Sequence, residues 1–267
     1  MKRNGLIIFL VAAGLLIVGE AVLQSIVSME ENKRAAAPGN SEIFDVGNLE
    51  IHPESVLTGK RILFLGSSVT YGAAAEGQSF VELFEYLDGV RAIKEAKSGT
   101  TLVDRTSVPA LLAFGNGDSY IKRLRAITSD DPLDGVVCQL STNDATMKMP
   151  LGEISSSTAL TDFDTQTITG AMEYIIKYSR ERWNCPVVFY TGSYYDSPEY
   201  RAMVERLYEL KDKWGIGLID LYTDAEFNNI DPETYELYMF DPIHPTKAGY
   251  INWWMPKMEK ELIAMYE

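Results

Sequence analysis

Five short strand-like runs, alternating with segments of helical periodicity, constrain the fold of this chain most strongly. The runs are RILFLG, RAIKEAKSG, GVVCQLS, PVVFYTG and GIGLIDLY, and the helical segments cover residues 79–87, 101–127, 165–183, 199–214 and 246–266. Strands that alternate with helices pair in parallel through right-handed crossovers, and largely apolar strands suit a sheet covered on both faces. The pattern therefore predicts an α/β fold: a three-layer, flavodoxin-like sandwich around a mostly parallel five-stranded sheet.

The first 29 residues differ from the rest of the chain. Two basic residues are followed by an uninterrupted apolar run from Gly5 to Gly19, and the segment stays mostly apolar to Met29. This pattern fits a cleaved signal peptide, and it also fits an uncleaved signal anchor long enough to cross a bilayer. The small-x-small sequence at residues 19–21 is a poor cleavage site, which favours the anchor. Either alternative places the C-terminal part outside the cytoplasm, tethered to the membrane or secreted.

The remainder divides into a short segment and one large domain. Residues 30–43 are first charged, then small and turn-forming, which is typical of a linker or stalk. Residues 44–267 show no internal repeat and no low-complexity tract, so we interpret them as a single domain.

Charge and cysteine content exclude several classes of function. The formal net charge is −14 and no basic stripe is present, so nucleic acid is excluded as a partner. Cys138 and Cys185 lie in apolar runs, where buried free thiols are the default; a single bond between neighbouring strands is the alternative. Two histidines and no metal-ligand spacing predict that the chain holds no metal and no cofactor.

Polar residues that carry chemistry gather where the predicted strands end. The first run ends at Gly66-Ser67-Ser68, and the second and third end near Gly99 and Asn143. In parallel α/β sheets, ligands bind beyond these carboxyl ends. The sequence therefore predicts a functional site at this edge of the sheet.

A serine that acts as a nucleophile at neutral pH needs a base, and histidine is the usual one. His244 follows Asp241 by three residues in DPIHP, where two prolines restrict the backbone. Such a turn can aim the carboxylate at one imidazole nitrogen and leave the other as the base. His52, in EIHPES, has no reactive neighbours in the sequence and is expected to be a surface or turn residue.

Together, four short blocks resemble a known family. FLGSSVTYG, SGTT, STND and DPIHP occur in the order and approximate spacing of the signature blocks of the SGNH (GDSL-type) hydrolases, from about residue 60 to the C-terminus. The resemblance implies that Ser68 is the nucleophile, His244 the base and Asp241 the acid that orients it. It also implies an oxyanion hole formed by the Ser68 N–H, the Gly99 N–H and the Asn143 amide.

Two positions depart from the family pattern. Ser67 stands where an aspartate usually precedes the nucleophile. This change is expected to alter how the turn that carries the nucleophile is held. Ser141 stands where the third block usually begins with glycine. Neither position supplies a triad residue, so catalysis is expected to survive both.

The resemblance implies a serine esterase without cofactors that hydrolyses esters in two acyl-transfer steps. An exported location favours removal of O-acetyl groups from carbohydrate, so the expected partners are a small-molecule or glycan ester and the membrane. Two alternatives stay open: a lipid-directed esterase, such as a lysophospholipase or thioesterase, and a non-catalytic glycan-binding module that kept the fold.

Overall fold

The structure, a computed structural model, describes residues 25, 28–51, 55–104, 118–129 and 131–267. At its centre lies a five-stranded sheet in the order β2-β1-β3-β4-β5, and all neighbouring strands are parallel. The strands are β1 (Arg61–Gly66), β2 (Arg91–Ala96), β3 (Gly135–Gln139), β4 (Val187–Tyr190) and β5 (Gly217–Ile219). Each lies within one of the predicted runs, so the predicted fold class is confirmed.

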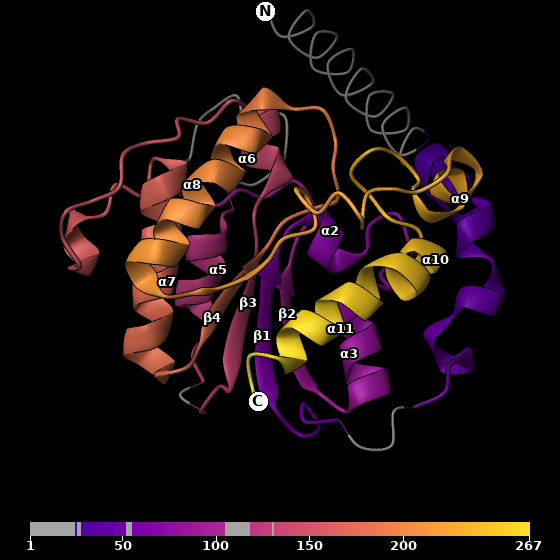
Figure 1. The fold of residues 1–267 in the computed structure, drawn as a ribbon, viewed down its shortest axis with the longest axis horizontal. Helices are drawn as coiled ribbons and strands as arrows, with labels where there is room; N and C mark the ends of the chain where they lie inside the picture. Colours follow the sequence, from indigo (N-terminus) through magenta and orange to yellow (C-terminus); the bar gives the residue numbers. More distant parts are fainter. Residues whose placement is uncertain (1–24, 26–27, 52–54, 105–117, 130) are drawn as a thin grey trace, which may run out of the picture.

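Helices cover both faces of this sheet (Figure 1). Helices α5, α7 and α8 pack on one face, and α3 and α11 pack on the other. The α-helices are α2 (Ser68–Tyr71), α3 (Phe80–Asp88), α5 (Tyr120–Ala126), α6 (Thr142–Thr146), α7 (Ile168–Trp183), α8 (Pro198–Trp214), α9 (Pro232–Tyr238), α10 (Lys247–Gly249) and α11 (Met255–Ile263). Short 3-10 helices cover Pro38–Asn40, Glu42–Phe44, Val46–Asn48 and Leu160–Asp162, and a π-helical turn covers Tyr250–Trp254.

The alternation of side chains along β1 builds two cores. Leu63 and Leu65 belong to the core beneath α5, α7 and α8, whereas Ile62 and Phe64 belong to the core beneath α3 and α11. All four side chains are fully buried. Because successive residues of a strand point to opposite faces, a run that is apolar throughout requires this double cover.

The helix predicted over residues 101–127 is wrong in its first turn. Thr101 forms an isolated bridge with Ser119, and the backbone N–H groups of Leu102 and Val103 donate to the carboxylate of Asp144. These hydrogen bonds tie Leu102 and Val103 to Asp144 in a non-helical bend, and α5 begins only at Tyr120, after its cap Ser119. Residues 105–117 of the prediction lie outside the described part of the chain.

The helix predicted over residues 246–266 is present but interrupted. Thr246 caps α10, a π-helical turn follows at Tyr250–Trp254, and α11 ends at Ile263. Pro256 lies just after the π-helical turn and has no N–H to continue the regular hydrogen-bond ladder. The interruption therefore has a local cause in the sequence.

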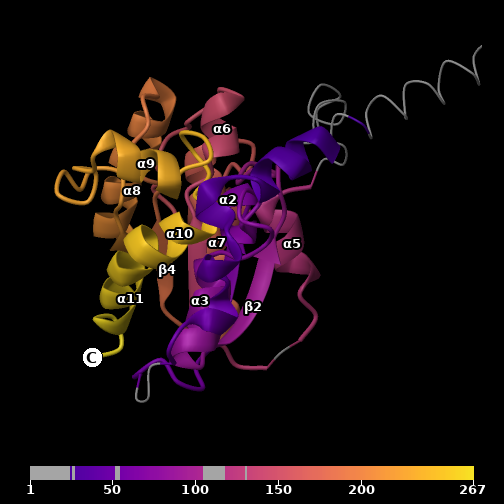
Figure 2. The ribbon, with the colours of Figure 1, turned by 90° about the vertical axis from the view of Figure 1, so that its right-hand side faces the viewer.

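Part of the segment interpreted as a linker is in contact with the domain. Asn40 is 4% exposed, and its side chain joins three backbone groups: its amide donates to the carbonyls of Arg34 and Ala74, and its oxygen accepts from the N–H of Lys247. Figure 2 shows this indigo segment beside α2. The segment near Asn40 is thus packed against the same domain that carries the strands.

Two predictions fall outside the described residues: the apolar N-terminal segment up to residue 24 and the placement of His52. Within the residues that the structure describes, no helix combines the length and the apolar character needed to cross a bilayer.

Candidate active site

Ser68 stands at the sharp turn between β1 and α2. Ser67 is the N-cap of α2, and Ser68 is its first residue, so the Ser68 N–H has no acceptor within the helix. Gly66 makes the turn sterically feasible, because a Cβ there would lie 1.7 Å from Oγ1 of Thr70. Ser68 itself is 7% exposed.

Three of the predicted site residues form one hydrogen-bonded chain. The Nε2 atom of His244 lies 2.8 Å from Oγ of Ser68, although the two residues are 176 positions apart in the sequence. The Nδ1 atom of His244 lies 2.9 and 2.8 Å from the two carboxylate oxygens of Asp241. These contacts leave Nε2 as the nitrogen that can accept a proton from the serine.

The turn that carries Asp241 also fixes its ionisation. Burial alone would raise the pKa of Asp241, but hydrogen bonds from the His244 ring and from the backbone N–H groups of Ile243 and His244 outweigh burial and hold this pKa below its ordinary value. Both N–H groups donate to the same carboxylate oxygen, at 2.8 and 2.9 Å. Asp241 is therefore an anion at neutral pH and can stabilise a positive charge on the imidazole.

Gly99 and Asn143 are held next to each other. Gly99 has φ +77°, a conformation that side chains rarely adopt and glycine adopts readily. One N–H of the Asn143 amide donates to the carbonyl of Thr100, the residue after Gly99, at 2.8 Å. A primary amide has two N–H donors, so this bond orients the group and leaves its second donor for another acceptor.

Asp144, the residue after Asn143, also connects its segment to the one that follows Gly99. Its fully buried carboxylate accepts from the N–H groups of Leu102 at 2.8 Å and Val103 at 3.2 Å. Burial raises the pKa of Asp144 to about 6, although Ser141 and the two backbone N–H groups act in the opposite direction. Ser141 caps α6, so the glycine that the family usually has there is replaced by a capping side chain.

Gln139, at the end of β3, supports the nucleophile turn and was not singled out from the sequence. Its side-chain oxygen accepts from the N–H of Ser67 at 2.9 Å and from the hydroxyl of Thr70 at 2.8 Å. The Thr70 hydroxyl also contacts the hydroxyl of Tyr190 at 2.6 Å. Ser67 replaces the aspartate that is usual in the family, and the turn that carries the nucleophile is supported instead by Gln139 from the neighbouring strand β3. The sequence offers one sign of this role: Gln139 is the one side-chain amide in the otherwise apolar strand β3.

Arg123 is a second residue that the sequence did not single out. Its guanidinium donates to the carbonyl of Gly66 at 2.6 Å and to the hydroxyl of Thr100 at 3.0 Å. The side chain therefore joins the turn before Ser68 to the turn around Gly99. Nothing in its local sequence marks it, because α5 carries several basic residues.

Other reactive side chains lie apart from this site. In the described ranges no three His, Cys, Asp or Glu side chains gather as a metal site. Cys138 and Cys185 are buried free thiols. Desolvation raises the pKa of both thiols, and for Cys185 to about 11, so neither is poised as a thiolate nucleophile.

Fold and site together define a class of protein: an α/β protein with a serine, a histidine and an aspartate hydrogen-bonded in a chain at the carboxyl edge of a five-stranded parallel sheet. Residues 64–250 match the GDSL-like lipase/acylhydrolase family, and the chain belongs to that family. It is therefore a hydrolase that acts on ester bonds.

Solved structures share this fold. One is 25% identical, with a TM-score of 0.62 over 78% of this chain and 98% of the other. A protein from Lactobacillus plantarum is 21% identical, with a TM-score of 0.58 over 78% of this chain and 96% of its own. An acetyl xylan esterase is 18% identical, with a TM-score of 0.52 over 75% of this chain and 98% of its own. No curated protein matches the chain in sequence.

Proposed function

We propose that this hydrolase is a serine esterase that removes O-acetyl groups from carbohydrate, with Ser68 as its nucleophile. The observation that carries the proposal is the hydrogen-bonded chain from Ser68 through His244 to Asp241. Oγ of Ser68 attacks the ester carbonyl carbon while Nε2 of His244 takes the hydroxyl proton. Asp241 orients the ring and stabilises the imidazolium that forms.

The negative charge that develops on the carbonyl oxygen requires fixed donors. We assign this role to the N–H groups of Ser68 and Gly99 and to the second N–H of the Asn143 amide. The alcohol leaves with the proton held by His244. His244 then activates a water molecule, which attacks the acyl-enzyme and releases the acid and the free serine.

The carbohydrate part of the proposal has two supports. A structural neighbour is an acetyl xylan esterase, although at 18% identity its likeness is one of fold. The basic and apolar N-terminus is typical of exported proteins, and envelope or extracellular glycans are the acetylated polymers met there. We accordingly propose that the domain acts outside the cytoplasm, tethered by residues 1–29 or released after their cleavage.

Acyl-chain profiling of the full chain, purified in detergent, tests the proposal. We expect acetate release from O-acetylated oligosaccharides, and p-nitrophenyl esters that are cleaved more slowly as the acyl chain lengthens. A lipid-directed esterase gives the opposite profile: fast cleavage of long acyl esters and no acetate from acetylated sugars. Ser68→Ala serves as the blank in every assay.

A further inference from the structure

At the β5 edge of the sheet lies a pocket with three tyrosines in its lining. It has a volume of about 470 Å³, in the usual range of small-molecule sites, and lies between α8 and the loop that follows β5. Tyr194, Tyr208 and Tyr222 contribute to its walls, together with Asn228. We call it the tyrosine pocket.

A second pocket links the tyrosine pocket to the turn that carries Asp241. This second pocket, of about 380 Å³, shares Tyr194 and Asn228 with the tyrosine pocket and extends to Tyr235 and Pro242. Pro242 directly follows Asp241.

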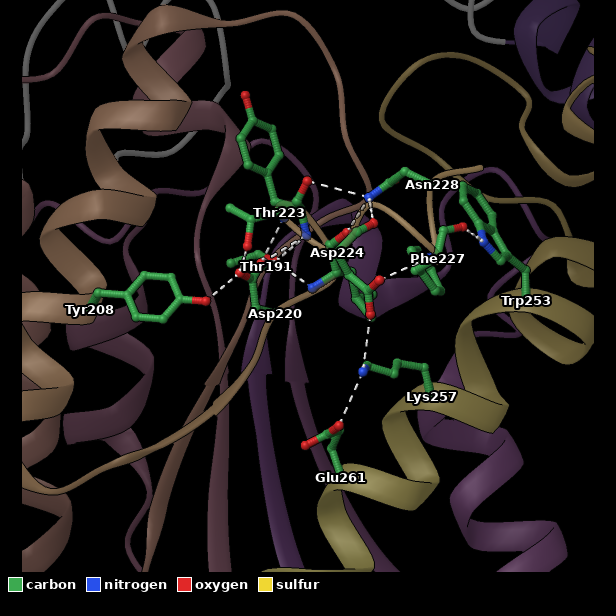
Figure 3. Close-up of polar contacts among 12 residues, drawn as sticks. Thr191, Tyr208, Asp220, Thr223, Asp224, Phe227, Asn228, Trp253, Lys257 and Glu261 are labelled. Carbon is green, nitrogen blue, oxygen red and sulfur yellow. Dashed lines mark hydrogen bonds and ion pairs between the residues drawn. The ribbon is translucent and has the colours of Figure 1, made fainter. Parts of the chain in front are cut away.

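The walls of the tyrosine pocket are held in place without a ligand. The amide of Asn228 donates to the carbonyls of Leu221 and Asp224, each at 2.7 Å, and its oxygen accepts from the N–H of Tyr194 at 2.9 Å. Figure 3 shows the side-chain nitrogen of Asn228 hydrogen-bonded to carbonyl oxygens of the loop that follows β5. A wall that is already ordered costs little conformational entropy when a ligand binds.

Asp220 holds the opposite wall. Its carboxylate accepts from the hydroxyl of Tyr208 at 2.6 Å and from the N–H of Thr223 at 3.1 Å (Figure 3). Several hydrogen bonds, including those of Thr223 and Tyr208, outweigh burial and keep the pKa of Asp220 below its ordinary value. Tyr208 is nevertheless 41% exposed, so its ring remains accessible while its hydroxyl is tied.

The aromatic rings present faces to a ligand, and their hydroxyl ends add polarity. The rings of Tyr194 and Tyr222 lie 5.3 Å apart and are inclined at 37° to each other. Tyr194 is 46% exposed. Such amphipathic surfaces suit ligands that have both apolar and hydroxylated sides.

The charges at the rim balance. Arg201 and Glu205 lie four residues apart on α8 and both line the pocket. Asp224, also at the rim, forms an ion pair of 3.1 Å with Lys257 (Figure 3). Balanced charge gives no preference for an anion or a cation, so the lining favours an uncharged ligand. A sugar unit is such a ligand, and it has both an apolar face for the tyrosine rings and hydroxyl groups for the polar side chains.

We propose that the tyrosine pocket is a carbohydrate subsite that binds an uncharged sugar unit of the acetylated chain whose ester lies at Ser68. The inference rests on the proposed function, because it supplies the remote binding contact for the same substrate. Binding at this distance confers preference for oligosaccharides over single acetylated sugars.

The test compares a substrate that reaches the pocket with one that does not. For Tyr208→Ala we expect kcat/KM on an O-acetylated oligosaccharide to fall about tenfold, mainly through KM, as the loss of one aromatic contact implies. Turnover of p-nitrophenyl acetate, which is too small to reach the pocket, reports on the fold and the triad. Tyr208→Phe keeps the ring and is expected to retain most of the preference for the oligosaccharide.

The outcomes separate this inference from the proposed function. Parent-like kinetics of Tyr208→Ala on the oligosaccharide overturn the subsite and leave the esterase intact. If the parent releases no acetate from any carbohydrate, the proposed function fails. A calorimetric titration of Ser68→Ala with unacetylated xylooligosaccharide then decides the subsite: binding that Tyr208→Ala removes supports it, and absence of binding overturns it.

Discussion

Replacing Gln139 with leucine tests whether the end of β3 positions the nucleophile. Gln139 is 1% exposed, and its oxygen is the acceptor for the N–H of Ser67. Leucine fills a similar volume but leaves that N–H buried without a partner. The Thr70 hydroxyl loses its bond to Gln139 but keeps its hydrogen bond with the Tyr190 hydroxyl. A buried unsatisfied group costs about 1–3 kcal/mol, and loss of the Thr70 bond adds about 1 kcal/mol, so we expect destabilisation of about 2–4 kcal/mol.

Activity is expected to fall for a geometric reason. The Ser67 N–H lies one residue before the nucleophile, and a displacement of about 1 Å at the reacting atom can cost roughly a hundredfold in rate. We therefore expect Gln139→Leu to lower kcat on p-nitrophenyl acetate by about 10- to 100-fold with little change in KM. Rates are measured well below the unfolding transition, and stability is measured by urea denaturation.

Gln78→Leu is the matched control. Gln78 is also a buried glutamine, and its side chain accepts from the N–H of Val46 at 2.8 Å and donates to the carbonyl of Phe44 at 2.8 Å, away from Ser68. It is expected to lose a similar amount of stability and to keep kcat. A parent-like kcat for Gln139→Leu, or an equal loss for Gln78→Leu, would refute the positioning argument.

Three further predictions concern the rest of the site and its supports. Asn40→Ala should lower the free energy of unfolding by about 2–4 kcal/mol, because three hydrogen bonds from its side chain to backbone groups, two of them buried, are lost; a change below about 0.5 kcal/mol in urea denaturation would indicate a loose linker. Burial raises the pKa of Asp144 from its ordinary 3.8 to about 6, so the folded state binds this proton more tightly than the unfolded chain does. The stability contributed by Asp144 should therefore fall by about 3 kcal/mol as the pH rises from about 3 to 7, and denaturation of Asp144→Asn should lack this component. Asp241→Asn should reduce kcat about 10²- to 10⁴-fold, since an amide stabilises neither the required tautomer nor the imidazolium; a parent-like rate would exclude Asp241 as the orienting acid.

The sheet could be read from the sequence because its signal is local. RILFLG coincides with β1, and the runs for β3 and β4 contain fully buried strands, since a strand buried on both faces must be apolar along its whole length. The edge strand β2 is exposed or half-buried throughout, so its run also carries charged residues. Periodicity extended the helix at residues 101–127 too far forward. Periodicity within this segment cannot show that the N–H groups of Leu102 and Val103 donate to the carboxylate of Asp144, about 40 residues further along the chain.

The site was predictable in part for a similar reason. Ser68, Asn143 and the Asp241–His244 pair lie in short blocks whose residue types suggest their chemistry. The groups that support them act across long separations: Gln139 reaches Ser67 over 72 positions, and Asn40 reaches Lys247 over 207. Such pairs leave no pattern in a single sequence, because either partner is unremarkable among its own neighbours.

Hydrolysis of p-nitrophenyl acetate by the full chain, Ser68→Ala and Ser67→Ala tests the central claim most directly. Ser68 lies 2.8 Å from Nε2 of His244, whereas Ser67 holds its turn through a backbone N–H that alanine retains. We predict that Ser68→Ala loses activity by at least about a thousandfold and that Ser67→Ala keeps most of it. An active Ser68→Ala protein, or loss of activity in Ser67→Ala alone, would contradict the assignment of the nucleophile.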